Sequence, residues 1–362
     1  MSELFAFHLL LTIKGYKSFK ELKLDLLPIN ILIGANGSGK SNFLSFFEFL
    51  NRLYEQKLTE YVALNGGMDK YFFQGSKTTD AIEATICFKN NSYSFELKEG
   101  DNRFVFSKEK LGYHSSYSDI ASFGNEACIK SYSGLSIGEH IRRYLSEIKK
   151  YHFHDTGKSS PFTKESHIVN DAYYLYEKGE NLAAFLYAVR ENSPITYKRI
   201  VRVVQSIAPY FSDFYFNVSA TDTVRLQWTD KFSSTVYGPT DLSDGTVRFI
   251  ALTTLFLQPV PPKVIIIDEP ELGLHPLAIQ KLAGLIKSVA SRGTQVIIAT
   301  QSADLITNFN AEDVITVNQT EGASVMKRHS SEELNAWLND YTLGDLWKQN
   351  ILKGAKINSQ TC

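Results

Sequence analysis

The chain has 362 residues, of which 43% are hydrophobic and 21% charged, and its formal net charge is -1. These values are typical of a globular protein of about two domains and exclude a strong overall attraction to nucleic acid or to a membrane surface. The cysteines, Cys87, Cys128 and Cys362, lack the spacing of a disulfide framework or a zinc site, which favours a reducing, cytoplasmic setting. No apolar run approaches the ~18 residues that a membrane-spanning helix needs.

The first elements are predicted to be strands. The apolar segment Phe5–Ile13 follows Glu3 and has no basic region before it, so we expect a first strand and not a signal peptide. Residues Lys20–Leu26 alternate between polar and apolar, and Pro28 separates them from the apolar run Ile29–Ile33. The sequence therefore predicts three strands before the first helix.

A glycine-rich stretch follows the third of these strands and opens the helix-like segment Asn42–Tyr54. Residues 34–41 read GANGSGKS, the pattern of a phosphate-binding loop. In such a loop, glycines allow backbone N–H groups to approach the phosphates, and the helix N-terminus adds the positive end of its dipole. Lys40 can then reach the β- and γ-phosphates, and the Ser41 hydroxyl can bind Mg²⁺. We predict that the loop binds a nucleoside triphosphate through Asn36, Gly37, Ser38, Gly39, Lys40, Ser41 and Asn42.

Downstream of this helix, the segments Ile82–Phe88 and Tyr93–Leu97 alternate in hydrophobicity on either side of an Asn-Asn-Ser turn. This pattern predicts a β-hairpin, with a further short strand at Phe104–Phe106. Half-exposed antiparallel strands of this kind indicate a sheet layer that packs beside the phosphate-binding sheet.

Residues 108–212 have a different character. A Ser-, Tyr- and Gly-rich loop is expected around Ser115–Ser118, and helices are expected over Gly138–Lys150, Asn181–Glu191 and Tyr197–Ile207. We interpret this region as a mainly helical insertion. Its basic residues fit an ordinary solvated helix surface better than a binding face.

A pair of histidines, His152 and His154, precedes Asp155 in this insertion. The spacing permits chelation of a metal from a strand, but no second group of ligands accompanies it in the sequence. A structural role is therefore the favoured interpretation, with metal binding as the minor alternative.

The nucleotide-binding pattern resumes after residue 240. A helix begins near Ser243 and runs to Leu257, and the buried strand Val264–Ile267 delivers Asp268 and Glu269 at its carboxyl end. In parallel sheets this edge binds ligands, so we predict that Asp268 holds Mg²⁺ and that Glu269 is the general base for the attacking water. A second buried strand, Gln295–Thr300, ends at Gln301, and two short strands and a helical tail follow.

The whole chain resembles the predicted AAA-type ATPases of the RecF, SMC and OLD-like group, which use an ABC-type nucleotide-binding fold. The segments that carry the resemblance are GYKSF at 15–19, the phosphate loop, Leu-Ser-Asp-Gly at 242–245, DEPELGLHP at 268–276 and Thr-Gln-Ser at 300–302. Short, stand-alone bacterial members also have stretches like 71–79 and 341–347. The resemblance implies an α/β P-loop NTPase of the ABC ATPase type, with an antiparallel β layer and a mainly helical insertion.

The resemblance also implies roles for individual residues. Gln74 would be the Q-loop residue that senses Mg²⁺ and the γ-phosphate, and Ser243 and Gly245 would belong to a signature motif that meets ATP held by a second subunit. The sequence departs from the family pattern twice, since Gln301 stands where a switch histidine is usual and Asp244 replaces a glycine. Because glutamine cannot carry a proton charge, we expect slow basal hydrolysis.

These observations predict a nucleotide-binding lobe in two parts, residues 1–107 and 213–330, with the insertion at 108–212 and a helical tail at 331–362. The resemblance implies a homodimer that closes around ATP and Mg²⁺. It also implies that this dimer senses a signal and regulates a partner effector encoded by a neighbouring gene, as in bacterial antiphage or toxin-like modules. The alternative is a RecF- or SMC-like ATPase that binds DNA directly in repair or recombination. The absence of long coiled-coil heptads and the neutral charge argue against that alternative.

Overall fold

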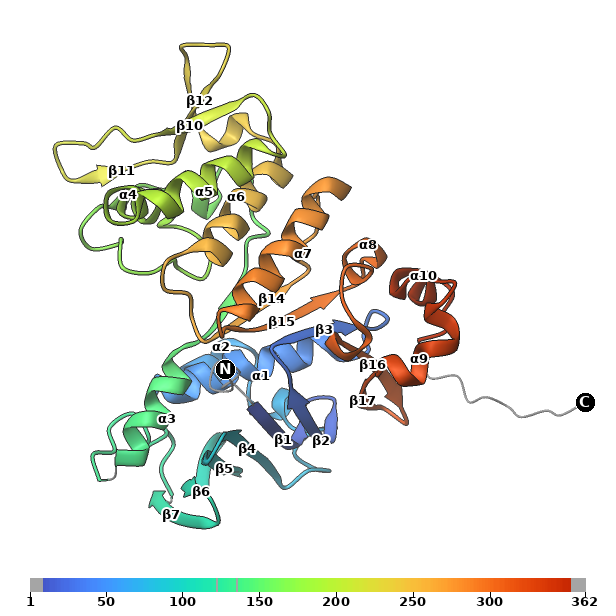
Figure 1. The fold of residues 1–362 in the computed structure, drawn as a ribbon. Helices are drawn as coiled ribbons and strands as arrows, with labels where there is room; N and C mark the ends of the chain where they lie inside the picture. Colours follow the sequence, from blue (N-terminus) through green and yellow to red (C-terminus); the bar gives the residue numbers. More distant parts are fainter. Residues whose placement is uncertain (1–8, 122, 135, 353–362) are drawn as a thin grey trace, which may run out of the picture. The chain divides into compact units, whose positions relative to one another are not determined.

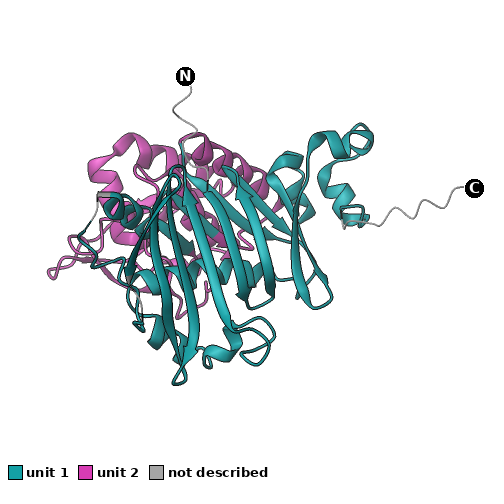
Figure 2. Cartoon of the chain, turned by 90° about the horizontal axis from the view of Figure 1, so that it is seen from below, with its two compact units in different colours: residues 1–150, 263–266, 293–362 teal, residues 151–262, 267–292 magenta. Residues whose placement is uncertain are grey.

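The structure, a computed structural model, describes residues 9–121, 123–134 and 136–352. Residues 5–8 of the predicted first strand, Cys362 and the end of the predicted tail lie outside these ranges. The chain divides into two compact units, which Figure 2 colours separately. Unit 1 comprises residues 1–150, 263–266 and 293–362, and unit 2 comprises residues 151–262 and 267–292.

The first layer of unit 1 is an antiparallel six-stranded sheet in the order β2-β1-β4-β5-β6-β7. Figure 2 shows this sheet across the face of unit 1. The predicted hairpin is confirmed, with Ile86 opposite Tyr93 in the β4–β5 register. The strands are β1 (Leu9–Tyr16), β2 (Phe19–Leu26), β4 (Ala81–Phe88), β5 (Asn91–Gly100), β6 (Arg103–Tyr113) and β7 (Ser116–Ala121).

The end of this sheet includes a segment that the sequence predicted as a loop. Strand β6 continues to Tyr113, and residues of the expected loop at Ser115–Ser118 contribute to β7. Polar composition suggested a loop, but β7 is an edge strand, where polar side chains are usual. The helix expected over Gly138–Lys150 is also shorter: α3 (Ser136–Ser146) ends before β8 (Ile148–Tyr151).

The second sheet runs in the order β17-β16-β3-β15-β14-β8. Strand β3 (Ile29–Ile33) is completely buried and pairs in parallel with β15 (Gln295–Thr300) and β16 (Val314–Thr320). Strand β14 (Val264–Asp268) carries the apolar run expected of a strand covered on both faces. β16 also forms a hairpin with β17 (Ala323–Arg328).

Helix α1 (Lys40–Tyr54) shares one buried core with the two sheets and contacts the first sheet through aromatic side chains. Phe46 meets Tyr16 of β1 with ring centroids 5.3 Å apart, and Phe49 meets Phe104 of β6 at 6.0 Å. Leu32 and Ile297 of the second sheet belong to the same buried core. Fully burying a Phe side chain stabilises the fold by about 1.5–3 kcal/mol, so this helix is anchored firmly behind the phosphate loop.

The remaining elements of unit 1 surround these layers (Figure 1). They are α2 (Leu58–Leu64), η1 (Met68–Tyr71), α8 (Ala303–Ile306), η4 (Ala311–Asp313), α9 (Ser331–Leu338) and α10 (Leu343–Lys348). The predicted helical tail is thus two short helices.

Unit 2 is built on helices. Helix α6 packs against both α5 and α7, and α4 packs against α5. Its helical elements are η2 (Pro161–Thr163), α4 (Leu182–Asn192), α5 (Pro194–Gln205), η3 (Pro239–Asp241), α6 (Asp244–Leu257) and α7 (Pro276–Ser291). Its short strands are β9 (Ser166–His167), β10 (Phe211–Tyr215), β11 (Thr223–Val224), β12 (Gln227–Asp230) and β13 (Val236–Tyr237). Within the described residues, no helix combines the length and the apolar character needed to cross a membrane.

Candidate active site

The phosphate loop connects β3 to α1 with a backbone that depends on glycine. Gly37 and Gly39 have φ angles of 78° and 113°, which L side chains rarely adopt. A Cβ atom on Gly39 would lie 2.1 Å from the hydroxyl of Ser324, whereas at Gly37 nothing lies within 4 Å. The loop is therefore packed closely on one side and open at Gly37.

The polar groups of the loop fit a phosphate. Helix α1 begins at Gly39 without a side-chain cap, and the hydroxyl of Ser38 is buried with no hydrogen-bond partner among the described residues. The ammonium of Lys40 donates to the carbonyl oxygens of Gly34 at 2.6 Å and Ala35 at 3.1 Å, so it lies over the loop. An uncapped helix N-terminus, an unused hydroxyl and a lysine together are suited to bind an anion.

Gln74 lies on a segment tied to the start of the chain. The backbone N–H of Phe73 donates to Gly15 at 2.9 Å, and that of Lys17 donates to Tyr71 at 2.7 Å. Gln74 itself has φ 56°, a left-handed conformation that persists in a non-glycine residue only when its surroundings enforce it. Sequence reasoning did not foresee that residues 15–17 hold this segment in place.

A cavity of about 680 Å³ brings two of the predicted site residues together. Asn42 from the phosphate-loop helix and Gln74 both line it, with Lys17 and Ser18 from the turn between β1 and β2. Lys17 is largely removed from solvent, and this desolvation lowers the pKa of its ammonium. The cavity thus has polar walls and a cation beside the phosphate loop.

The predicted carboxylates stand at the end of β14. Asp268 is the last residue of this strand, and Glu269 follows with φ 41°. The strained backbone of Glu269 is held by the bond from the N–H of Leu272 to its carbonyl at 3.2 Å. The carbonyl oxygen of Asp268 lies 2.8 Å from Nε2 of His154. This conformation is strained in a non-glycine residue and persists only where surrounding contacts enforce it.

The predicted signature segment starts helix α6 in unit 2. The Ser243 hydroxyl accepts a hydrogen bond from the N–H of Thr246 at 3.2 Å. Ser243 therefore serves as the N-cap of helix α6. A Cβ atom on Gly245 would lie 2.3 Å from the carbonyl oxygen of Gly273, so only glycine fits there. The side chain of Asp244 is exposed.

Arg248 is a site residue that the motif analysis missed. Its guanidinium is buried in unit 2 and donates to the carbonyl oxygens of Phe153 and His154, each at 3.0 Å, and to that of Leu272. Desolvation lowers its pKa, although the guanidinium stays charged at neutral pH. It joins the signature helix to the segment that follows the two carboxylates. The signal in the sequence was a single cation inside an otherwise apolar helix.

Gln301, at the predicted switch position, follows β15 in unit 1 and is exposed. Its carbonyl oxygen accepts from the indole N–H of Trp347 in α10 at 3.3 Å. The predicted site residues therefore fall into two groups. Residues 36–42, Gln74 and Gln301 belong to unit 1, and Ser243, Gly245, Asp268 and Glu269 belong to unit 2.

The two histidines of the insertion have a structural explanation. Their rings lie 4.4 Å apart, and His154 contacts the backbone of Asp268. In the part of the chain that the structure describes, no group of three or more His, Cys, Asp or Glu side chains is placed to hold a metal by itself. A Mg²⁺ ion bound through one or two protein oxygens and the phosphates of a nucleotide does not require such a group.

Comparison with known families identifies the chain. A model described as "AAA ATPase domain" matches residues 10–223, which is more than half of the sequence. The chain belongs to this family. A second model, described as "AAA domain, putative AbiEii toxin, Type IV TA system", matches residues 167–307.

Two curated relatives extend this result. The Old nuclease of Escherichia phage P2 is 23% identical over 377 aligned positions, covering 89% of this chain and 61% of the nuclease. The energy-coupling factor transporter ATP-binding protein EcfA2 of Lactobacillus delbrueckii subsp. bulgaricus is 27% identical over 140 residues, covering 37% of this chain and 47% of that protein. The chain thus spans about half to three fifths of the length of the curated relatives it matches.

Solved structures show the same fold. An Smc head bound to the C-winged helix domain of ScpA aligns with a TM-score of 0.64 and 17% identity, covering 91% of this chain and 99% of that one. An Smc head from Pyrococcus furiosus aligns with a TM-score of 0.57 and 16% identity, covering 92% of this chain and 98% of that one. The predicted P-loop fold of the ABC ATPase type and the resemblance to the RecF, SMC and OLD-like group are confirmed.

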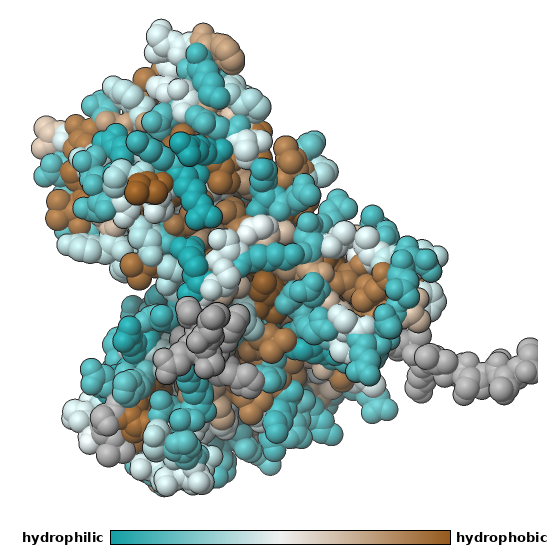
Figure 3. All heavy atoms as spheres, in the orientation of Figure 1, coloured by the Kyte–Doolittle hydropathy of each residue, from teal (hydrophilic) through white to brown (hydrophobic). Residues whose placement is uncertain are grey.

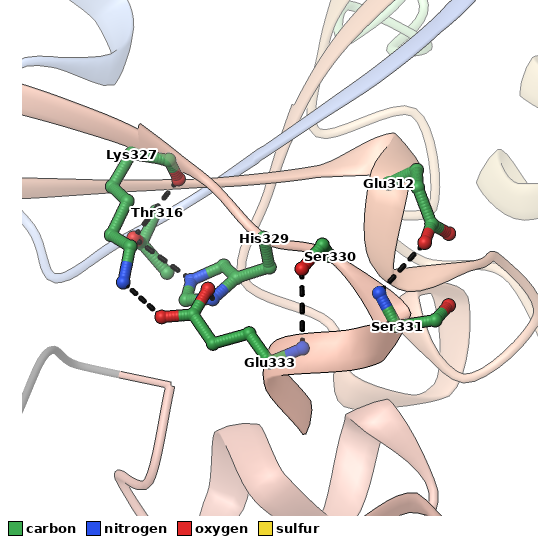
Figure 4. A network of polar contacts seen from close by, with 7 residues as sticks. All are labelled: Glu312, Thr316, Lys327, His329, Ser330, Ser331 and Glu333. Atoms are coloured by element: carbon green, nitrogen blue, oxygen red, sulfur yellow. Dashed lines mark hydrogen bonds and ion pairs between the residues drawn. The ribbon is translucent and has the colours of Figure 1, made fainter. Parts of the chain in front are cut away.

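A polar network joins the β16–β17 hairpin to the tail (Figure 4). His329 is buried, and its Nε2 lies 3.2 Å from the hydroxyl of Thr316, which donates to the carbonyl of Lys327. The Nδ1 atom of His329 lies 3.7 Å from the carboxylate of Glu333 in α9, which also pairs with Lys327.

This network predicts a pH dependence of stability. Burial lowers the pKa of His329 below its ordinary value of 6.5, although Glu333 opposes the shift. The unfolded chain then binds more protons than the folded chain, so the free energy of unfolding decreases as the pH falls from 6.5 toward the lowered pKa. The pKa of Glu333 is lowered from 4.5, so its own contribution is lost only in a more acidic range. In His329→Gln the loss of stability between about pH 7.5 and about pH 5.5 should be smaller, as measured by urea unfolding. Equal losses in both proteins would contradict the assignment.

Proposed function

We propose that the chain binds ATP with Mg²⁺ and hydrolyses it to ADP and phosphate. The observation that carries the proposal is the phosphate loop, where the buried Ser38 hydroxyl, the Lys40 ammonium and the uncapped start of α1 converge on one short stretch of backbone. In this proposal the Ser41 hydroxyl binds Mg²⁺, Asp268 holds the ion through water, and Gln74 senses the ion and the γ-phosphate. The metal would neutralise the charge that develops on the phosphates.

In this mechanism Glu269 accepts a proton from water as the water oxygen bonds to the γ-phosphorus. The bond from that phosphorus to the bridging oxygen of ADP breaks, and Lys40 stabilises the negative charge on the phosphate oxygens. Gln301 contributes a hydrogen bond at the switch position but no positive charge, so we infer slow basal turnover.

We infer that a second copy of the chain completes each site. Ser243 is exposed at the start of the fourteen-residue helix α6, so its hydroxyl and the helix N-terminus are accessible to a nucleotide held by another molecule. Two ATP molecules sandwiched head to tail would then hold the homodimer together.

We further infer that the ATP-dependent dimer acts on a partner effector in an antiphage or toxin-like module of a bacterial cytoplasm. Such a partner has two candidate docking regions, the insertion and the tail. Trp337 and Tyr341 of the tail are 45% and 41% exposed, and Figure 3 shows hydrophobic residues gathered at the level of α8 and α10. The bond from Trp347 to Gln301 gives the tail a direct link to the switch position. A nuclease or toxin encoded by the neighbouring gene would be such a partner.

Direct DNA binding, the alternative, receives less support. Among the basic residues in the range 108–212 that could contact DNA, Arg142 donates to the carbonyl of Tyr132, and Lys150 pairs with Glu48 at 2.9 Å. Arg143 pairs with Glu147 at 3.3 Å. Carboxylates next to these cations reduce the positive potential that a phosphate backbone needs.

Removing the proposed base tests the chemistry. Glu269→Gln should retain ATP but hydrolyse it at least ~10²-fold more slowly, because the amide cannot accept the proton. The measurement is phosphate release under saturating ATP, with ATP affinity measured separately. Glu271→Gln, two residues further along the same loop, is the matched control and should retain most of the activity. Turnover that survives in Glu269→Gln but is lost in Glu271→Gln would assign the base to Glu271.

A mixing experiment tests assembly. Ser243→Arg should bind ATP but prevent closure of the dimer, and Lys40→Ala should fail to bind ATP, so each variant alone should be inactive. In a heterodimer of the two, one composite site has an intact phosphate loop and an intact signature segment, and phosphate release should partly return. The head-to-tail dimer would be refuted if sedimentation showed that a monomer has full activity at every concentration.

A further inference from the structure

The β16–β17 hairpin occupies a particular place beside the phosphate loop. Strand β16 pairs in parallel with β3, the strand that leads directly into the loop, with Thr316 opposite Ile33. The hairpin reverses at Glu321 and Gly322, whose φ angles of 52° and 78° are both positive, as in the tight two-residue turns that fix a hairpin's register. The position of β17 relative to the loop is therefore set by backbone pairing.

Ser324 of this hairpin is buried and bonds to the loop. Its hydroxyl lies 2.7 Å from the carbonyl oxygen of Ser38 and 2.8 Å from the hydroxyl of Ser18. The Ser324 hydroxyl is the donor toward both oxygens, so its single proton serves one acceptor or the other at a given moment. Ser18 in turn accepts from the side-chain amide of Asn42 at 3.0 Å. One chain of hydrogen bonds therefore links the phosphate loop to Ser324, Ser18 and Asn42.

The bond to Ser38 orients a peptide group of the loop. In a trans peptide the C=O and N–H groups point in opposite directions, so holding the Ser38 carbonyl toward Ser324 turns the N–H of Gly39 to the other side. The backbone N–H of Ser324 also donates to the carbonyl of Ser18 at 2.7 Å, which keeps the hydroxyls together. The hairpin thus restrains the peptide at which α1 begins.

The same hairpin approaches the Q-loop. A Cβ atom on Gly322 would lie 3.4 Å from the side-chain nitrogen of Gln74. One rigid hairpin therefore touches the phosphate loop through Ser324 and lies beside Gln74 at its turn. Nothing in the sequence motifs points to either contact, since residues 320–324 belong to none of them.

We propose that Ser324 is a positioning residue for nucleotide binding, which holds the phosphate loop in its binding conformation before the nucleotide arrives. The proposal rests on the proposed function. The proposed effect differs from a general loss of stability, because it acts on the phosphate loop, which would bind both ATP and ADP. Loss of the Ser324 hydroxyl should weaken the binding of ATP and of ADP by the same factor and leave turnover at saturating ATP unchanged.

The test compares Ser324→Ala with wild type by calorimetric titration of ATP and of ADP, each with Mg²⁺. Losing one net hydrogen bond predicts roughly three- to tenfold weaker binding of both nucleotides, a KM for ATP raised by a similar factor, and an unchanged kcat. Thr320→Ala removes an exposed hydroxyl from the same hairpin and should bind both nucleotides like wild type. A lowered kcat with unchanged affinity for ADP would overturn the proposal.

A second variant distinguishes loop positioning from a general loosening of the hairpin. Because the hydroxyls of Ser324 and Ser18 are hydrogen-bonded to each other, the effects of Ser18→Ala and Ser324→Ala on ADP affinity should not add in the double variant. Additive effects would contradict a shared chain of bonds. If wild type itself binds neither nucleotide, the proposed function fails; if wild type binds and Ser324→Ala binds equally well, only this inference fails.

Discussion

The site depends above all on one constraint, the conformation of the backbone where β3 turns into α1. An uncapped helix start is unfavourable unless another group satisfies it, and the conformations at Gly37 and Gly39 are open mainly to glycine. The fold compensates by burying α1 between aromatic side chains of the first sheet and aliphatic side chains of the second, and by holding the Ser38 carbonyl from the β16–β17 hairpin. The loop is thus rigid on its packed side and open at Gly37.

Unit 2 shows the same use of buried polar contacts around its own functional segment. Arg248 fixes carbonyl groups on both sides of the carboxylate segment, and His154 contacts the backbone of Asp268. Truncating such a buried cation would leave several acceptors unpaired, which costs about 1–3 kcal/mol for each. The left-handed backbone of Glu269 therefore persists in a rigid setting. Both units keep their unusual backbone conformations next to residues with a proposed chemical role.

Much of this architecture could be predicted from the sequence, where local patterns were strong. The strand Ile29–Ile33 has the predicted bounds, and the buried run before Asp268 reads clearly as a strand because both of its faces are covered. Edge strand β7 was missed, since its polar residues look like a loop until β6 is placed beside it. The four-segment domain division and the roles of the site residues stay predictions.

The contacts that position the site were the least predictable part. Ser324 lies 286 residues from Ser38 in the sequence, and a lone serine in a short strand carries no motif. Arg248 was more visible, because a cation in an apolar helix requires a buried partner. Gln74 and Glu269 matched family patterns, but their positive φ angles appear only in the folded chain. Long-range hydrogen bonds of this kind depend on the complete fold and leave no local signal.

Nucleotide binding at the phosphate loop is the central claim, and titration calorimetry of ATP with Mg²⁺ into wild type and Lys40→Ala tests it most directly. The account predicts saturable binding to wild type and none to Lys40→Ala at matched concentrations, with the variant folded as judged by its circular dichroism. Equal ATP affinity in the two proteins, or no binding to folded wild type, would contradict it.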